Sequence, residues 1–197
     1  MMKTFIKEAL ITLGLAIVLY VALTFVIQNS PVIGSSMEPN LLPSGQRILV
    51  SRVAYWFQTP QRGDIVTLHP PKDWNNPSGH PFVKRIIGLP GETVEIKDNK
   101  VYINDVALDE PYLSPNVIMR TMPAVTVPAD SYFVLGDNRE VSEDSSYAAD
   151  NHLADFAVPR SGIIGKAWLS IWPASTWGLA PNYSHYNVDQ TIPAISQ

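Results

Sequence analysis

The sequence predicts a mainly β protein, an antiparallel β-sandwich or barrel, carried on one N-terminal transmembrane helix. One long apolar run predicts the helix, because 18 of the 23 residues from Phe5 to Ile27 are hydrophobic. Short runs of β-branched and aromatic residues after residue 30 predict the strands, and there is little helical periodicity between them. The 17 prolines and 11 glycines punctuate these runs, as expected for strands joined by loops.

The apolar run is long enough to span a bilayer. Its core covers residues 9–27, and nineteen helical residues at about 1.5 Å each extend roughly 28 Å. A cleaved secretory signal is the alternative, but its apolar core is shorter, about 7–15 residues, and residues 26–31 offer no convincing Ala-x-Ala pattern. We therefore expect an uncleaved anchor in a lipid bilayer.

Basic residues predict the orientation of this anchor. Lys3 and Lys7 precede it, whereas the next basic residue is Arg47. The positive-inside rule then places residues 1–8 in the cytoplasm and the chain after the anchor outside it, in a single-pass protein of the plasma membrane. The aromatic cluster Tyr55–Phe57 is compatible with contact to the outer leaflet and, equally, with core packing.

Charge and cysteine content exclude several classes of function. The chain after the anchor holds 12 basic and 17 acidic residues, and its net charge of −5 argues against binding nucleic acid. Without cysteine it has neither disulfides nor thiolate metal ligands. We expect no metal and no cofactor, and a protein that functions as a monomer. The histidines lack metal-binding spacing; they are His69, His80, His152 and His185.

Residues 28–173 form the expected extracytoplasmic domain, and 174–197 a polar, proline-containing tail with little order. Strands are expected over Gln46–Val53, Asp64–His69, Phe82–Ile87, Thr93–Ile96, Val101–Ile103, Ser131–Leu135 and Ile163–Ile171. Asp98-Asn99 predicts a hairpin turn. Longer loops are expected over Pro70–Pro81 and Arg139–Pro159.

Two short segments are candidates for chemistry. Gly34–Pro39 is a turn of small residues near the membrane exit that can expose a hydroxyl and backbone N–H groups, but it also has the composition of a linker. The strand Phe82–Ile87 carries Lys84 and Arg85, which alternation places on opposite faces, so at least one is expected to face inward. A buried lysine has a lowered pKa, whereas a lysine on an edge strand guards against aggregation. From these residues alone, the linker and the edge strand are the simpler interpretations.

Four ordered segments resemble the conserved boxes of bacterial type I signal peptidases, the serine–lysine enzymes that remove signal peptides from exported proteins. The segments are Gly34–Pro39, Pro60–Val66, Val83–Glu92 and Gly136–Ser145, in the family's order and spacing. The resemblance covers most of the chain. It implies a membrane-bound serine endopeptidase with the β-rich signal-peptidase fold.

The resemblance also implies a role for individual residues. Ser36 matches the nucleophile, Lys84 the general base that acts only when neutral, and Ser142 the serine that orients the lysine. In some members a serine two residues before the nucleophile completes the oxyanion hole, but this chain has Gly34 at that position. The Ser36 backbone N–H and Ser35 are therefore expected to form the hole. The implied path is attack by Ser36, an acyl-enzyme, and hydrolysis with Lys84 again as base.

The last box departs from the family pattern. Ser146 stands where the family has an arginine that pairs with the aspartate two residues earlier, here Asp144, so this ion pair is absent. The segment Tyr147–Phe156 is longer and irregular, and the match resumes at Val158. These differences concern the loop geometry and leave the serine–lysine pair intact.

The substrates implied by the resemblance are signal peptides of exported preproteins, bound as an added strand beside the strand of Lys84. Small residues at positions −1 and −3 from the cut would fill shallow apolar pockets. The candidate pocket residues are Val32, Met37, Leu41, Phe82 and Val83.

Two other functions are alternatives. A self-cleaving repressor with a related β-fold uses the same serine–lysine chemistry, but it would need a DNA-binding helix-turn-helix where this chain has an apolar anchor. A membrane-anchored β-rich binding module would have the same architecture with an inactive dyad.

Overall fold

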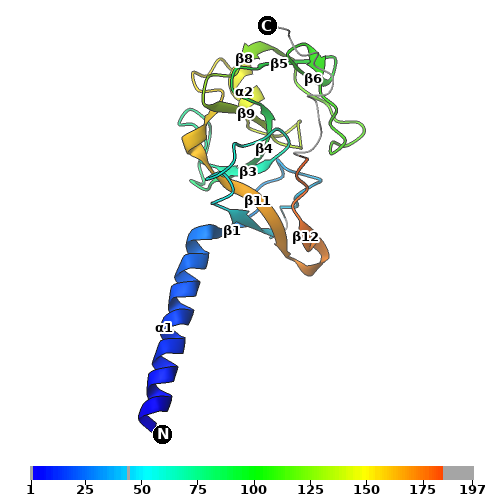
Figure 1. Cartoon of the computed structure of the whole chain (residues 1–197). Coiled ribbons are helices and arrows are strands. Elements are labelled where there is room, and N and C mark those ends of the chain that lie inside the picture. The colour runs from blue at the N-terminus through cyan, green and yellow to red at the C-terminus, as the bar shows by residue number, and fades with distance from the viewer. Residues whose placement is uncertain (1, 44, 184–197) are drawn as a thin grey trace.

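One long helix and a β domain make up the computed structural model, which describes residues 2–43 and 45–183 (Figure 1). Helix α1 (Met2–Val26) projects from one end of the domain. Its segment Thr4–Val26 has a mean hydropathy of 2.5, is exposed along its length and, within the described residues, is the one helix apolar and long enough to cross a membrane. The helix ends at Val26, one residue earlier than expected, because Ile27 pairs with Ser51 in a sheet.

The larger sheet is antiparallel and follows the order β1-β2-β11-β3-β4-β9-β10, with β12 paired to β11. Its strands are β1 (Ile27–Pro31), β2 (Arg47–Ser51), β3 (Ile65–Leu68), β4 (Phe82–Gly88), β9 (Ser131–Leu135), β10 (Val158–Pro159), β11 (Ile163–Trp172) and β12 (Gly178–Leu179). Strand β4 lies inside this sheet, between β3 and β9. It is therefore not an edge strand.

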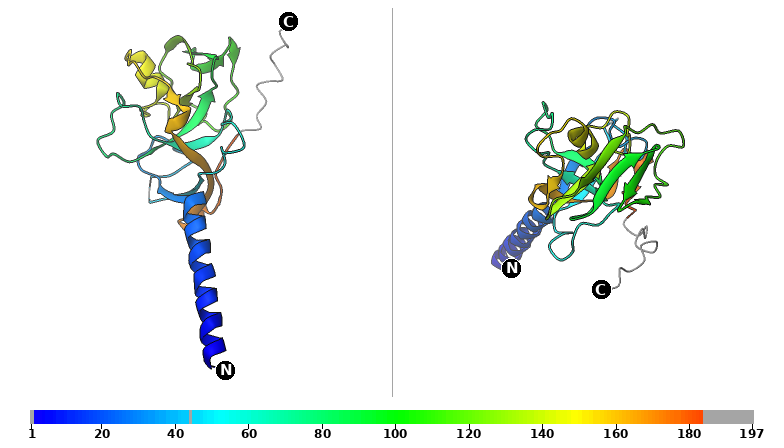
Figure 2. Two further views of the ribbon diagram at one scale, coloured as in Figure 1. Left: turned by 60° about the vertical axis from the view of Figure 1, so that its left-hand side comes forward. Right: turned by 90° about the horizontal axis from the view of Figure 1, so that it is seen from above.

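A second antiparallel sheet has the order β7-β6-β5-β8. Its strands are β5 (Thr93–Lys97), β6 (Lys100–Ile103), β7 (Val106–Ala107) and β8 (Met122–Thr126). The expected hairpin turn joins β5 to β6, and positive φ angles of 50° at Asp98 and 59° at Asn99 match the twist of such a turn. This sheet lies at the end of the domain opposite α1, whereas β1 and β12 lie beside α1 (Figures 1 and 2).

Three buried apolar clusters cover both faces of β4. Val83 and Ile87 point to one face, where each joins a different cluster, and Ile86 joins the third on the other face. Because β4 is enclosed on both sides, Lys84 and Arg85 are both buried even though they face opposite ways. Both basic side chains of β4 are thus in the interior of the domain. The sequence predicted that at least one of them would face inward.

The mainly β architecture and all seven expected strands are confirmed. The expectation that Arg139–Pro159 is a loop is wrong in part, because α2 (Ser145–Asp150) forms there behind the N-cap Asp144. The described part of the expected tail, 174–183, also differs from expectation: it forms the 3-10 turn Ala174–Thr176 and strand β12, and Ala180 packs into the core. Residues 184–197, with His185, lie outside the described residues.

Candidate active site

Ser36 lies at the tip of a loop that is tied down on both sides. The loop leaves β1 through Val32, whose N–H bonds the Gln46 carbonyl at 2.8 Å, and it turns so that Leu41 N–H reaches the Met37 carbonyl at 2.9 Å. Met37 and Leu41 are each 1% exposed and anchor the loop in the core. The segment is therefore an ordered turn that presents Ser36, and its interpretation as a linker is wrong.

The segment after β9 holds this loop from the other side. Asn138 donates its backbone N–H to the Ser36 carbonyl at 2.9 Å and its side-chain amide to the Ser35 carbonyl at 3.2 Å. Gly136 lies so close that a Cβ there would overlap both the Ser36 carbonyl oxygen and Ser142 Oγ. Gly136 therefore lies where the Ser36 loop and Ser142 come together.

Lys84 is buried, with 3% of its surface exposed, and its ammonium nitrogen donates a hydrogen bond of 2.9 Å to Ser142 Oγ. Burial lowers the Lys84 pKa from 10.5 to about 8, while Asp144, Glu143 and Asp137 act in the opposite direction. A large fraction of this lysine is thus neutral at mildly alkaline pH. The edge-strand interpretation of Lys84 is wrong.

A cleft of about 280 Å³ brings Ser36 and Lys84 together with Ser35. Among the candidate pocket residues, Phe82 and Val83 line this cleft, whereas Val32, Met37 and Leu41 lie in the buried cluster that includes Val83. Further lining residues were missed in the sequence: they are Ile33, Gly34, Ser78, His80, Pro81, Val141 and Glu143. The loop Pro70–Pro81 carries no motif that signals its approach to Ser36, whereas Val141 and Glu143 flank the predicted Ser142 in the sequence.

A buried ion pair lies beside the cleft. Arg85 donates to both carboxylate oxygens of Asp137, at 2.8 Å from Nε and 2.7 Å from Nη2. Its guanidinium lies 4.0 Å from the Tyr112 ring centroid and 5.2 Å from that of Tyr183. This pair joins the strand of Lys84 to the segment that holds Ser36.

The structure explains how Asp144 is satisfied without the family's arginine. One carboxylate oxygen accepts the Ser146 hydroxyl at 2.7 Å and the Ser146 N–H at 3.0 Å, and the other accepts the Gly136 N–H at 2.9 Å. Asp144 thereby caps α2 and ties it to the active-site segment. Within the described residues Asp144 forms no salt bridge, and its negative charge is the largest influence that raises the Lys84 pKa.

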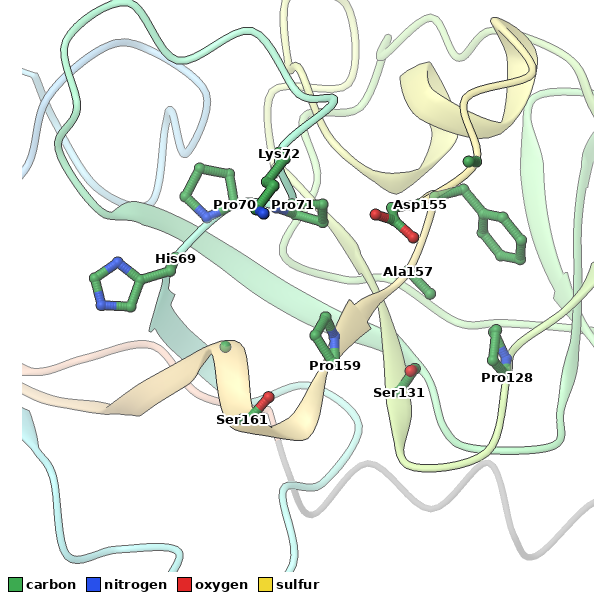
Figure 3. Close-up of a pocket in the computed structure, with 13 residues that line it drawn as sticks. His69, Pro70, Pro71, Lys72, Pro128, Ser131, Asp155, Ala157, Pro159 and Ser161 are labelled. Atoms are coloured by element: carbon green, nitrogen blue, oxygen red, sulfur yellow. The ribbon is translucent and has the colours of Figure 1, made fainter.

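A larger hollow of about 600 Å³ lies elsewhere and contains none of the predicted site residues. Prolines line much of it, and Lys72 and Asp155 lie at its rim together with His69 (Figure 3). Within the described residues there is also no cluster of three His, Asp or Glu side chains able to hold a metal ion. Ser35, Ser36 and Lys84 therefore lie together in the smaller cleft and not in this hollow.

A serine in a cleft with a buried lysine whose pKa is lowered, set in an antiparallel β domain, is the arrangement of a serine hydrolase with a lysine base. A family model described as "Signal peptidase, peptidase S26" matches residues 2–172. The chain belongs to this family of serine endopeptidases.

Relatives of known name agree with this assignment. A signal peptidase I of Leptolyngbya laminosa is 39% identical over 177 residues, covering 88% of this chain and 83% of that protein. A probable signal peptidase I-1 of Synechocystis is 40% identical over 178 residues, covering 88% and 86%. A crystal structure of a signal peptidase I from Enterococcus faecalis is 36% identical, with a TM-score of 0.44 over 55% of this chain and 97% of that one.

Proposed function

We propose that this protein cleaves N-terminal signal peptides from exported preproteins, with Ser36 as nucleophile and neutral Lys84 as general base. The observation that carries the proposal is the burial of Lys84 in the cleft of Ser36, where its pKa falls to about 8. Ordinary lysine is almost fully protonated at neutral pH and cannot accept a proton. A buried lysine that hydrogen-bonds Ser142 is poised to take one.

The reaction follows from these groups. Lys84 Nζ removes the Ser36 hydroxyl proton as Oγ attacks the scissile carbonyl, and it then passes this proton to the departing amine. The product of this half-reaction is an ester between Ser36 and the signal peptide. Water hydrolyses the ester with Lys84 again as base, which restores the free serine.

Backbone geometry supports an oxyanion hole at Ser36. The Ser35 carbonyl accepts hydrogen bonds from Glu38 N–H at 3.1 Å and from Asn138 at 3.2 Å. Because a trans peptide is planar, the Ser36 N–H points away from those partners. We place this N–H, with Ser35, at the carbonyl oxygen of the substrate, where one donor is worth about 3 kcal/mol.

The substrate segment lies as an added strand between residues 32–34 and the start of β4, because β9 pairs only with Arg85, Ile86 and Gly88 and leaves this side of Phe82–Lys84 unpaired. Phe82 and Val83 form walls of the cleft, while Met37 and Leu41 support it from the core. The proposal of small residues at −1 and −3 rests on membership of the signal peptidase family, and we place these residues in the cleft of about 280 Å³. One chain supplies every residue of this site, so we propose that a monomer is sufficient.

Exposed aromatic side chains support a membrane location, and Lys3 and Lys7 at the start of α1 support a cytoplasmic N-terminus with an extracytoplasmic domain. Tyr55 is buried, but its neighbours Trp56 and Phe57 are 68% and 91% exposed. Trp56 lines a hollow with Phe25 of α1, and Trp168 lines another with the last residue of α1. Indole rings favour the membrane–water interface, so these side chains lie where the chain leaves the bilayer.

Cleavage of a purified preprotein by the full-length protein in lipid vesicles tests the proposal. We expect Ser36→Ala and Lys84→Met to abolish cleavage, and Ser78→Ala to retain it, because Ser78 lines the same cleft without a proposed role. Equal cleavage by Ser36→Ala and wild type would refute the proposal and favour the anchored binding module.

A further inference from the structure

We propose that Asn40 is a positioning residue that aligns the Ser36 loop with Lys84 by fastening this loop to the buried Arg85–Asp137 pair. The inference rests on the proposed function of Ser36 and Lys84. It adds a residue that touches neither the substrate nor the reacting atoms.

Asn40 follows Ser36 by four residues in the same turn, and its side-chain amide has two donor hydrogens. The Nδ2 atom lies 2.8 Å from Asp137 Oδ2 and 2.8 Å from the Tyr112 carbonyl oxygen. Both hydrogens are therefore used, and both partners are separated from Asn40 by more than 70 residues of chain. The amide is a long-range tether of the loop.

The Asp137 end of this tether is rigid. Its carboxylate is buried and accepts two hydrogen bonds from Arg85, whose Nη1 also donates to the Gly63 carbonyl at 2.9 Å. Charge-assisted bonds in a buried site are short and strong. Arg85 directly follows Lys84 in β4, so the tether runs from the Ser36 loop to the strand of the proposed base.

The Asn40 hydrogen bond to Asp137 fixes the orientation of the Ser36 loop at a second place, beyond its contacts with Asn138. Asn138 holds the start of the turn at two carbonyls, that of Ser36 from its backbone N–H at 2.9 Å and that of Ser35 from its side-chain amide at 3.2 Å. Asn40 holds the loop four residues further on, against the residue that precedes Asn138. Two fixed points on one rigid segment set the direction in which Ser36 Oγ faces. A misplacement of about 1 Å at a reacting atom lowers the rate by about 100-fold.

Two substitutions separate a donor role from a space-filling role. Asn40→Ala removes both donors, whereas Asn40→Asp keeps the shape and turns an acceptor towards the Asp137 carboxylate. We expect kcat to fall by about 10–100-fold in Asn40→Ala and further in Asn40→Asp, with KM within about twofold of wild type. The apparent pKa on the acid side of the pH profile of Asn40→Ala should remain at the wild-type value, because the surroundings of Lys84 are unchanged. Asn40→Ser, which keeps one hydroxyl donor, should recover part of the lost kcat.

The control is Asn151→Ala, because Asn151 Nδ2 also donates to a main-chain carbonyl, that of Tyr147 at 2.8 Å, but at the C-terminal end of α2 and not among the residues that line the cleft. It should retain kcat. All variants are compared well below their unfolding temperatures in the full-length protein. Wild-type kcat in Asn40→Asp, a loss confined to KM in Asn40→Ala, or no recovery in Asn40→Ser would each overturn the inference. Cleavage retained by Ser36→Ala would instead refute the proposed function itself.

Discussion

Lys84 Nζ donates a hydrogen bond of 2.9 Å to Ser142 Oγ, and both side chains are almost completely buried, with 3% and 2% exposed. The lysine side chain has four rotatable bonds, and this contact selects one position for its nitrogen. A neutral amine that donates one N–H to Ser142 keeps its lone pair for the Ser36 proton. The contact therefore orients the proposed base as well as holding it.

Removal of the Ser142 hydroxyl should slow the chemical step. We expect Ser142→Ala to lower kcat by about 10–100-fold, because general-base catalysis depends on the position of the base. Ser145→Ala is a matched control: Ser145 is also fully buried, and its Oγ accepts the Val134 N–H at 3.0 Å. It should reduce the unfolding temperature more than kcat. The reverse pattern in steady-state kinetics and thermal unfolding would contradict this assignment.

Glu143 should tune the pH dependence. It lines the cleft, and its charge raises the Lys84 pKa, so Glu143→Gln should lower the apparent pKa of kcat/KM. Exposed Glu140 in the same segment is the control, and Glu140→Gln should leave the profile in place. A profile that moves to higher pH in Glu143→Gln would show that this charge does not act on the base.

Burial of the Lys84 ammonium group should lower the free energy of unfolding, and Lys84→Met should restore it. Between about pH 8 and 10.5 the unfolded lysine is protonated while the folded one is not, so its contribution to stability rises with pH through this window. Below pH 8 the folded state carries the full penalty, about 3 kcal/mol. Lys84→Met should therefore be more stable than wild type at pH 7, and the difference should shrink towards pH 10.5. Urea unfolding of both proteins at several pH values measures it; a constant difference would contradict the prediction.

Gly136 should tolerate no side chain. A Cβ at this position would overlap Ser142 Oγ and the Ser36 carbonyl oxygen, so Gly136→Ala should separate the segments that carry the proposed nucleophile and the orienting serine. We expect loss of cleavage together with a lower unfolding temperature. Gly14→Ala is the control, because a Cβ on Gly14 meets nothing within 4 Å. Full activity in Gly136→Ala would show that this close approach is not required.

The long apolar helix and seven strands could be predicted because they depend on local patterns, whereas Ser36, Lys84 and Ser142 were predicted only from the resemblance to a family, since local composition favoured a linker and an edge strand. Apolar length predicts a membrane helix, and alternation predicts opposite faces for Lys84 and Arg85. Whether β4 is an edge or an interior strand depends on the order of the strands, which alternation does not contain. The burial of both cations was therefore only partly predictable.

Long-range contacts account for most of what was missed. Asn40 and Asp137 are 97 residues apart in the chain, and neither carries a local signal of their hydrogen bond. The consequence of Ser146 was visible only in space, where its hydroxyl satisfies Asp144 in place of an arginine. The short helix α2 did have a local signal, because Asp144 is a good N-cap residue before Ala148 and Ala149.

The pH dependence of preprotein cleavage tests the central claim, that neutral Lys84 is the base for Ser36. The account predicts that kcat/KM of the wild-type protein rises about tenfold per pH unit and levels off above a single ionisation near pH 8, because only the deprotonated lysine accepts the Ser36 proton. A rate that is constant from pH 6 to 10, or that levels off already above about pH 6.5 as for a histidine base, would contradict it.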